Sequence, residues 1–249
     1  MVKTVAHRGY SGKYPENTVV ALREAARLCV EMVELDVIPS ADGEIMVIHD
    51  QTVNRTTDGT GRVVEMPFEA LRRLDAGCRR ELPGQKIPTL QEAIDATGSS
   101  VELNINLKFF DHFVRNAREE KLMRDYEERV VKIVADLGAM ERSFFAIHPE
   151  KQIERIRALA PQCNAILLFW RDGDHYIRRS AEMGLKVTQP DCDLMSPQFV
   201  ASLHEAGLVG NVFYANTADD MKSFILMGID GILTDEPELL LQVRQEFRN

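Results

Sequence analysis

The sequence predicts a (β/α)8 barrel, and three observations support this prediction. Short runs rich in β-branched residues alternate with amphipathic stretches almost to the end of the chain, an order typical of parallel βα units. Eight strand candidates can be found, one before each of eight helical stretches. The 249 residues also fit a single barrel of about 250. A doubly wound open sheet is the alternative.

The expected elements follow one another regularly. Strands are expected at Thr4–His7, Met32–Val37, Val101–Leu107, Ser143–Ile147, Ala165–Phe169, Leu185–Gln189, Gly210–Tyr214 and Asp230–Leu233. Helices are expected at Thr18–Cys29, Leu90–Ala96, Tyr126–Leu137, Pro149–Ala160, Tyr176–Met183, Pro197–Glu205, Ala218–Met227 and Pro237–Phe247. Helix start signals are Asn17 before Thr18, Thr89 with Glu92, Ser196 before Pro197, and Thr217 with Asp220.

One stretch, at about residues 50–86, interrupts this alternation. It contains many turn-forming residues and is too long for a simple βα loop. We interpret it as an insertion beside the barrel mouth, with one helix at Phe68–Leu74. No repeat or linker divides the chain, so residues 1–249 form one domain with an inserted subdomain.

Composition excludes several classes of protein. The net charge of −9 repels polyanions, so we expect no nucleic-acid partner, although a local phosphate pocket is compatible with it. There is no signal-peptide pattern and no apolar run long enough for an integral membrane segment. The four cysteines form no CxxC pair and are expected to be reduced and mostly buried, in a cytoplasmic protein. The partner is then a small molecule, and the oligomeric state, including a homo-oligomer, stays open.

Two acids on the second expected strand indicate a metal site. In Val33-Glu34-Leu35-Asp36-Val37 the acids share one face and the apolar residues the other. The apolar face packs against helices, so Glu34 and Asp36 point into the barrel. Two close carboxylates repel each other unless a proton or cation lies between them, and oxygen ligands favour Mg²⁺ or Ca²⁺. The alternative is a solvated edge strand with alternating charges.

The third expected strand repeats this pattern. Its inward face carries Glu102, Asn104, Asn106 and Lys108. Asn106 and Lys108 lie at the C-terminal end, where barrel active sites occur. Glu102 lies deeper and is expected in a structural network at the bottom of the barrel.

Two histidines end apolar runs. His7 and Arg8 end the first strand, and His49 follows Ile45-Met46-Val47-Ile48. Phosphodiester cleavage needs a base for the nucleophile, an acid for the alkoxide leaving group and cations for developing charge. A lone histidine is more often structural, but this sequence places all three kinds of group at expected strand ends.

These residues occur in short sequence blocks that can be compared with those of a known family. The blocks are Ala6-His7-Arg8-Gly9, Tyr14-Pro15-Glu16-Asn17-Thr18, Glu34-Leu35-Asp36-Val37, His49-Asp50, Arg55-Thr56-Thr57-Asp58-Gly59-Thr60-Gly61, Ile87-Pro88-Thr89-Leu90, Leu103–Lys108 and Gly228–Pro237. In order and spacing they resemble the glycerophosphodiester phosphodiesterase family over the whole chain. The resemblance implies a (β/α)8 barrel, also called a TIM barrel, with an insertion after the second strand.

The resemblance also implies roles. His7 and His49 would be the general acid and base, in an order left open, and Arg8 would hold the phosphate while Lys108 balances its charge. Glu34 and Asp36 would bind the divalent metal ion. Glu16 matches a supporting position, and Asn17 is also a candidate cap for the first helix. A glycerol hydroxyl would attack phosphorus to give a cyclic phosphate that water then opens.

Three departures from the family pattern matter. Asn106 stands where relatives usually carry a third acidic ligand, so it can ligate a metal ion but adds no charge. Phe213 stands where relatives usually have tryptophan; it is either a substrate-binding wall or simple barrel core. His148 is either an extra polar group at the mouth or part of a helix start.

Three functions follow for comparison. The leading hypothesis is metal-dependent hydrolysis of glycerophosphodiesters to glycerol 3-phosphate and an alcohol. The second keeps the chemistry with another headgroup, such as a sugar phosphodiester. The third is a barrel-fold binding protein that has lost turnover, for which Asn106 is the residue that raises the question.

Overall fold

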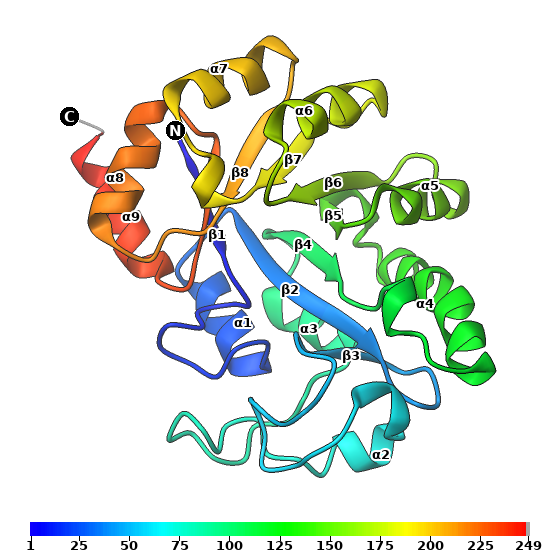
Figure 1. Ribbon diagram of the computed structural model, residues 1–249. Coiled ribbons are helices and arrows are strands. Elements are labelled where there is room, and N and C mark those ends of the chain that lie inside the picture. The colour runs from blue at the N-terminus through cyan, green and yellow to red at the C-terminus, as the bar shows by residue number, and fades with distance from the viewer. Residues whose placement is uncertain (248–249) are drawn as a thin grey trace.

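The computed structural model describes residues 1–247, and within them eight parallel strands close into a barrel (Figure 1). The strands are β1 (Lys3–Ala6), β2 (Met32–Pro39), β4 (Glu102–Leu107), β5 (Ser143–Ile147), β6 (Asn164–Phe169), β7 (Val187–Pro190), β8 (Val209–Phe213) and β9 (Gly231–Thr234). Neighbours follow chain order, and β1 pairs with both β2 and β9, which closes the ring. The (β/α)8 prediction is confirmed, and the open sheet is excluded.

Helices surround the barrel and cover its outer face (Figure 1). They are α1 (Val19–Arg27), α3 (Leu90–Thr97), α4 (Ala117–Asp136), α5 (Glu150–Leu159), α6 (Gly173–Glu182), α7 (Pro197–Glu205), α8 (Ala218–Met227) and α9 (Pro237–Glu246). Single 3-10 turns lie at η1 (Val63–Glu65), η2 (Asp111–Phe113), η3 (Met140–Arg142) and η4 (Cys192–Leu194). The outward apolar residues of the strands and the buried faces of these helices form the main core.

Three of the four predicted helix starts are capped as expected, and one differs. Thr89 and Glu92 form a reciprocal capping box, and Ser196 and Thr217 cap α7 and α8. Asn17 does not cap α1, because its side chain binds Asp36; Thr18 accepts the hydrogen bond from Ala21 instead.

The helix α4 begins at Ala117, well before the predicted Tyr126. Its cap is Asn116, whose side chain accepts a hydrogen bond from the Glu119 amide at 3.0 Å. The charged first half of the helix hid the apolar periodicity from the sequence pattern.

The insertion after β2 is irregular, as predicted. It follows the short strand β3 (Ile45–Val47), which pairs antiparallel with β2, and its helix α2 (Phe68–Leu71) is shorter than expected. The buried Arg62 binds both carboxylate oxygens of Glu119 on α4, at 2.9 and 3.2 Å, and the Phe113 carbonyl. This ion pair fixes the insertion to the side of the barrel.

The barrel interior has a polar half and an apolar half. Inward positions of β5 and β6 carry Ala146, Ile166 and Leu168, which form a small apolar cluster. At the bottom of the other half, Lys3 lies 2.7 Å from Glu102, which confirms the expected structural network there. The acids and amides of β2 and β4 point into this polar half.

Two further expectations concern the surface. Within the described part of the chain no helix is long and apolar enough to cross a membrane. All four cysteines are free, but Cys29 and Cys78 are exposed and Cys163 alone is fully buried, so the expectation of mostly buried thiols was wrong. The two exposed thiols lie in a helix-end turn and in the insertion, where no core is available to cover them.

Candidate active site

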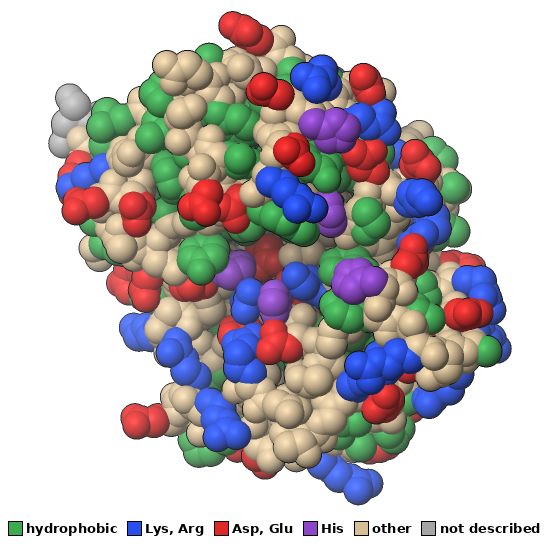
Figure 2. Space-filling view, in the orientation of Figure 1, with side chains coloured by type: hydrophobic (Ala, Val, Ile, Leu, Met, Phe, Trp, Pro, Cys, Tyr) green, Lys and Arg blue, Asp and Glu red, His purple; other side chains and the backbone are tan. Residues whose placement is uncertain are grey.

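The residues from the sequence prediction meet at the C-terminal end of the barrel, on the face shown in Figure 2. This face is hollowed at its centre, where acidic, cationic and histidine side chains gather. His7 and Arg8 follow β1, Glu34 and Asp36 lie on β2, and Asn106 lies one residue before the end of β4. The hollow combines with the polar half of the barrel interior to form one site.

Arg8 occupies an unusual backbone conformation that directs it into this site. Its φ is +57°, and the next residue, Gly9, has φ +78°. A Cβ at Gly9 would lie 2.5 Å from the Ala21 carbonyl carbon, so the tight packing of this turn on α1 requires glycine. The turn lets the Arg8 amide donate to Glu34 at 2.9 Å, while its side chain forms ion pairs with Glu16 at 2.8 Å and Asp36 at 3.3 Å.

Glu34 and Asp36 are almost fully enclosed, each with 1% of its surface exposed. Burial, and then the neighbouring Asp36, raises the pKa of Glu34 to about 7. Burial alone would also raise the pKa of Asp36, but His49, Arg8 and Lys108 outweigh it and lower the value. The pair therefore shows the repulsion that the sequence predicted for two carboxylates on one strand face.

These two acids fit a hard divalent cation. Oδ1 of Asp36 is buried and has no hydrogen-bond partner among residues 1–247. Oε1 of Glu34 has only a contact of 3.5 Å with the Asn106 amide nitrogen. Unpaired buried carboxylate oxygens are costly, and a cation bound between them would remove that cost. The donor set is all oxygen once the Asn106 amide is turned, which suits Mg²⁺ or Ca²⁺.

Lys108 provides a cation beside this pair. It follows β4, and its ammonium makes no hydrogen bond or ion pair within the described residues. Its charge lowers the pKa of both Asp36 and His49, so it lies close to both. It is available to an anionic ligand in the hollow.

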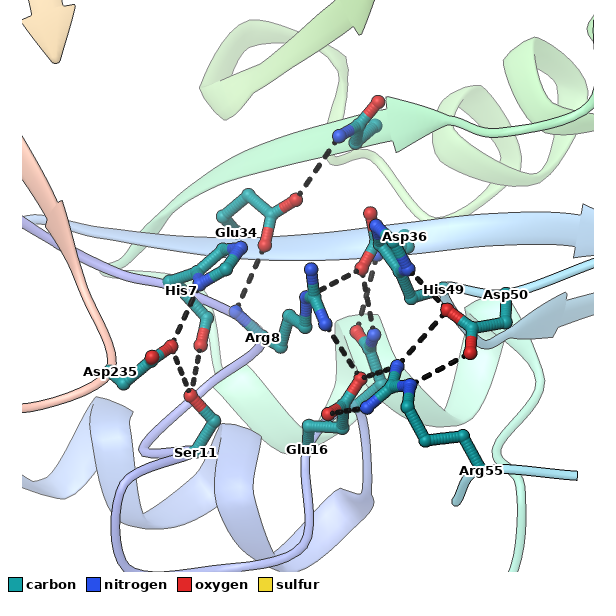
Figure 3. A network of polar contacts seen from close by, with 12 residues as sticks. His7, Arg8, Ser11, Glu16, Glu34, Asp36, His49, Asp50, Arg55 and Asp235 are labelled. Atoms are coloured by element: carbon teal, nitrogen blue, oxygen red, sulfur yellow. Dashed lines mark hydrogen bonds and ion pairs between the residues drawn. The ribbon is translucent and has the colours of Figure 1, made fainter. Parts of the chain in front are cut away.

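The two histidines each bind an aspartate through Nδ1. His7 Nδ1 lies 2.8 Å from Asp235 Oδ1, and His49 Nδ1 lies 2.6 Å from Asp50 Oδ1 (Figure 3). Each carboxylate accepts the Nδ1 proton, which leaves Nε2 as the nitrogen that can exchange a proton with a ligand.

The surroundings shift the pKa values of the two histidines in opposite directions. Burial lowers the pKa of His7, but the hydrogen bond to Asp235 and the charge of Glu34 outweigh it, so the net shift is upward. Burial also lowers the pKa of His49, and together with the charges of Lys108 and Arg8 it outweighs the opposing Asp36 and Asp50.

Asp235 itself is firmly held. It follows β9 and accepts hydrogen bonds from Ser11 Oγ at 2.8 Å and Asn216 Nδ2 at 2.6 Å. Burial opposes ionisation, yet His7 and these donors lower the pKa of Asp235 to about 2. Its charge and orientation are therefore fixed before any ligand binds.

Glu16 links the loop after β1 to the insertion. Besides Arg8, it binds Arg55, whose guanidinium reaches both Glu16 oxygens at 2.6 and 2.8 Å and also Asp50 at 2.7 Å (Figure 3). Arg55 thus joins the supports of Arg8 and His49 into one network. The supporting role expected of Glu16 stays a prediction.

A pocket of about 520 Å³ extends from the hollow past His7. It runs between the loop after β1, the insertion and the loop after β8. Tyr214 lines it and stacks on His7, with ring centroids 5.5 Å apart. Phe213 packs on Val5, Met32 and Leu233 inside the barrel, so the wall role proposed for Phe213 remains a prediction.

Several site residues were not selected from the sequence. Asp235, Asp50 and Arg55 occur in the blocks that carried the family resemblance, but a block does not show which of its members reaches a histidine. Tyr214 gave no signal beyond its place at a strand end. His148 donates from Nδ1 to the Leu168 carbonyl at 3.1 Å and contacts Trp170, on the opposite side of the mouth.

Among the described residues, a second acidic group lies after β7. Asp191, Cys192 and Asp193 bring three potential ligand atoms within 4.8 Å, but Asp191 already accepts the Asp193 amide. It contains none of the expected site residues.

The fold and the site together are those of a (β/α)8-barrel hydrolase with a buried acid pair, Arg8 and Lys108 beside it, and two histidine–aspartate pairs. Residues 7–239 match the family model described as Glycerophosphoryl diester phosphodiesterase family, and the chain belongs to that family of phosphoric diester hydrolases.

Relatives of known name agree along the whole chain. A glycerophosphodiester phosphodiesterase of Caldanaerobacter subterraneus subsp. tengcongensis is 30% identical over 241 residues, covering 96% of both chains. Another from Bacillus altitudinis is 27% identical over 253 residues and covers both chains fully.

Solved structures show the same barrel. A phosphodiesterase from Oleispira antarctica, in complex with the product sn-glycerol-3-phosphate, superposes with a TM-score of 0.86 at 25% identity, covering 98% of this chain and 96% of that one. A glycerophosphodiester phosphodiesterase from Agrobacterium tumefaciens superposes with a TM-score of 0.81 at 26% identity, covering 96% and 99%.

Proposed function

We propose that this protein hydrolyses glycerophosphodiesters to glycerol 3-phosphate and an alcohol, with a Mg²⁺ or Ca²⁺ ion held by Glu34 and Asp36. The observation that carries the proposal is the buried acid pair, with Asp36 Oδ1 unpartnered in the described structure, flanked by two histidine–aspartate pairs. The product named in the Oleispira antarctica complex supports the choice of substrate. A cytoplasmic location remains a prediction from the sequence.

Arg8 and Lys108 would bind the phosphoryl oxygens. Arg8 is anchored by Glu16 and Asp36, so its guanidinium is oriented in advance, whereas Lys108 provides a mobile point charge. A bound divalent ion would supply further positive charge against the phosphoryl oxygens. Asn106 would offer its amide oxygen to that ion if the amide turns away from its present contact with Glu34.

His49 would act as the base and His7 as the acid in the first step. Burial, together with the charges of Lys108 and Arg8, lowers the pKa of His49 and favours its neutral form, which can accept a proton at Nε2. The carboxylate of Asp235 favours the charged form of His7, which can donate one at Nε2. Groups held in opposite protonation states near neutral pH are what acid–base cleavage requires.

The nucleophile would be a hydroxyl of the glycerol itself. As His49 removes the proton of this hydroxyl, the hydroxyl oxygen forms a new bond to phosphorus. The bond from phosphorus to the oxygen of the leaving alcohol breaks, and His7 protonates that leaving oxygen. Binding has already removed the orientational freedom of the attacking group, which favours this intramolecular route. Water would then open the cyclic phosphate, with the two histidines exchanging roles.

An activity assay with defined metal tests the proposal. Metal-free protein is incubated with glycerophosphocholine and either Mg²⁺ or Ca²⁺, and glycerol 3-phosphate is measured. We expect activity only with added ion, and loss in His7→Ala and His49→Ala. His204→Ala is the matched control, because His204 also pairs with an aspartate, Asp230 at 3.0 Å, away from the site.

The outcomes separate the alternatives. Turnover of a sugar phosphodiester but not of glycerol diesters would replace the proposed substrate by another headgroup. Absence of turnover on every diester, with metal binding retained in calorimetry, would indicate the non-catalytic barrel. Full activity in both histidine variants would contradict their assigned roles.

A further inference from the structure

The pocket beside His7 contains cationic side chains that the proposed chemistry does not use. Arg79 and Arg80 come from the insertion, and Glu236 comes from the start of α9. Figure 2 shows Lys and Arg side chains on the lower part of this face, below the hollow, where Figure 1 draws the insertion. None of these three residues touches the buried acid pair, so they need a different explanation.

The charges of both arginines are uncompensated by any carboxylate in the described structure. Arg79 is exposed and has neither a hydrogen bond nor an ion pair there. Arg80 donates to the backbone carbonyls of Ser11 and Gly12, the latter at 2.8 Å, so it retains its full positive charge. These two bonds also hold the insertion against the loop after β1, which keeps the wall of the pocket in place.

One carboxylate in the pocket is also unpaired. Glu236 makes no ion pair among residues 1–247, and its Oε1 would lie 2.2 Å from a Cβ built at Gly12. The loop therefore carries glycine where this carboxylate approaches it. The pocket presents guanidinium groups on the insertion and, on the barrel rim, a carboxylate without an ion-pair partner in the described structure; Tyr214 also lines it and stacks on His7.

The pocket lies where a leaving alcohol would emerge, if the proposed function is correct. His7 donates the proton to the leaving oxygen in that scheme, and the space continues from His7 into the pocket. A small cavity lined by His49 has a volume of about 10 Å³, comparable to that of one water molecule. The pocket beside His7 therefore offers a leaving alcohol far more room than this cavity does.

We propose that this pocket selects leaving alcohols that carry a carboxylate and an ammonium group, as serine does, with Arg79 binding the carboxylate and Glu236 the ammonium. Arginine binds a carboxylate through two parallel hydrogen bonds, which gives selectivity as well as affinity. Arg80 contributes charge to the same wall. This inference rests on the proposed function, because it assumes that the diester is cleaved at this site.

Two diesters that differ by one group test the inference. Glycerophosphoserine and glycerophosphoethanolamine share the glycerol phosphate and the ammonium, and only the first carries the carboxylate. We expect wild type to prefer the serine diester in kcat/KM, mainly through a lower KM. Arg79→Ala should reduce the serine-to-ethanolamine ratio by about tenfold or more, and Arg79→Lys by less, because lysine lacks the planar fork.

Two further variants sharpen the result. Arg73→Ala removes an exposed arginine from the same insertion outside the pocket, and should leave the ratio unchanged. Glu236→Gln should weaken the binding of both diesters to the same extent, since both carry the ammonium group.

Each outcome decides one point. An unchanged ratio in Arg79→Ala, or an equal fall in Arg73→Ala, would overturn the inference while leaving the hydrolase intact. Cleavage of glycerophosphocholine but of neither of these two diesters would also overturn the inference, whereas failure of wild type to cleave any of the three diesters with any ion would refute the proposed function. Circular dichroism of each variant verifies that the fold is retained, so a lost ratio is not mistaken for unfolding.

Discussion

The Oδ1 atom of Asp235 lies 2.8 Å from Nδ1 of His7, although 228 positions separate the two residues. The contact joins the loop after the first strand of the barrel to the loop after the last. It orients the imidazole, determines which nitrogen faces the hollow and favours the protonated ring. In the proposed mechanism Asp235 would be a positioning residue that acts through His7.

The substitution Asp235→Asn tests this role. We expect kcat to fall by roughly 10² to 10⁴, because the amide neither fixes the tautomer nor stabilises the charged ring. An acid must be protonated, so activity is lost as pH rises through its pKa. Loss of the carboxylate lowers the pKa of His7, and the alkaline limb of the pH–rate profile should move to lower pH.

Asp230→Asn is the control, since Asp230 pairs with His204 at the other end of the same strand. It should leave the profile in place. An alkaline limb that stays fixed in Asp235→Asn, despite a lower kcat, would show that His7 is not the acid.

The substitution Asp50→Asn should shift the acidic limb of the pH–rate profile. A base must be deprotonated, so activity is lost as pH falls through the pKa of His49, which lies below its ordinary 6.5. The hydrogen bond from Asp50 raises that pKa, and its removal should lower it. The acidic limb should move down by about one pH unit or less, measured by kcat/KM against pH. Movement to higher pH would contradict the assignment of His49 as base.

The substitution Asn106→Glu should tighten metal binding by roughly tenfold or more, because it adds a third carboxylate to the ligand set. Isothermal titration with Mg²⁺ or Ca²⁺ in the absence of substrate measures this directly. Asn106→Gln has the same length without the charge and should show no such gain. Equal or weaker metal affinity in the glutamate variant would contradict the interpretation that Asn106 occupies the position of a third acidic ligand.

The ion pair between Arg62 and Glu119 should contribute to stability. Both side chains are almost fully enclosed, and removal of Glu119 leaves Arg62 with only the exposed Glu65 and the Phe113 carbonyl as partners. Glu119→Ala should destabilise the protein by about 3 kcal/mol in urea unfolding, and the double variant with Arg62→Ala by much less than the sum. Strict additivity would mean that the pair is not coupled.

Much of the site could be predicted because strand parity is a local property. Alternation in Val33–Val37 places Glu34 and Asp36 on the inner face whatever the rest of the chain does, and the structure has them there. The number of parallel units fixed the barrel, since closure needs eight strands in chain order. The same alternation on the next parallel strand pointed to Asn106 and Lys108.

The supports of the histidines could not be predicted, because they depend on closure and register. Nothing local to Thr234-Asp235-Glu236 shows that β9 pairs beside β1, and the direction of Asp235 follows from that pairing. Asn17 illustrates the converse: its sequence context indicates a helix cap, but the buried Asp36 competes for its amide, and Thr18 is available to cap α1.

The pairing of β1 with β9 also determines at which point of its synthesis the protein can become catalytically active. The ribosome makes His7, Arg8 and the acid pair early, but Asp235 emerges only after almost the whole barrel has been translated. Until the last strand docks beside the first, the barrel of the nascent chain is still open. His7 then has no aspartate to fix its tautomer. Hydrolytic activity should therefore arise abruptly with the final strand, without weaker activity in earlier, shorter nascent chains.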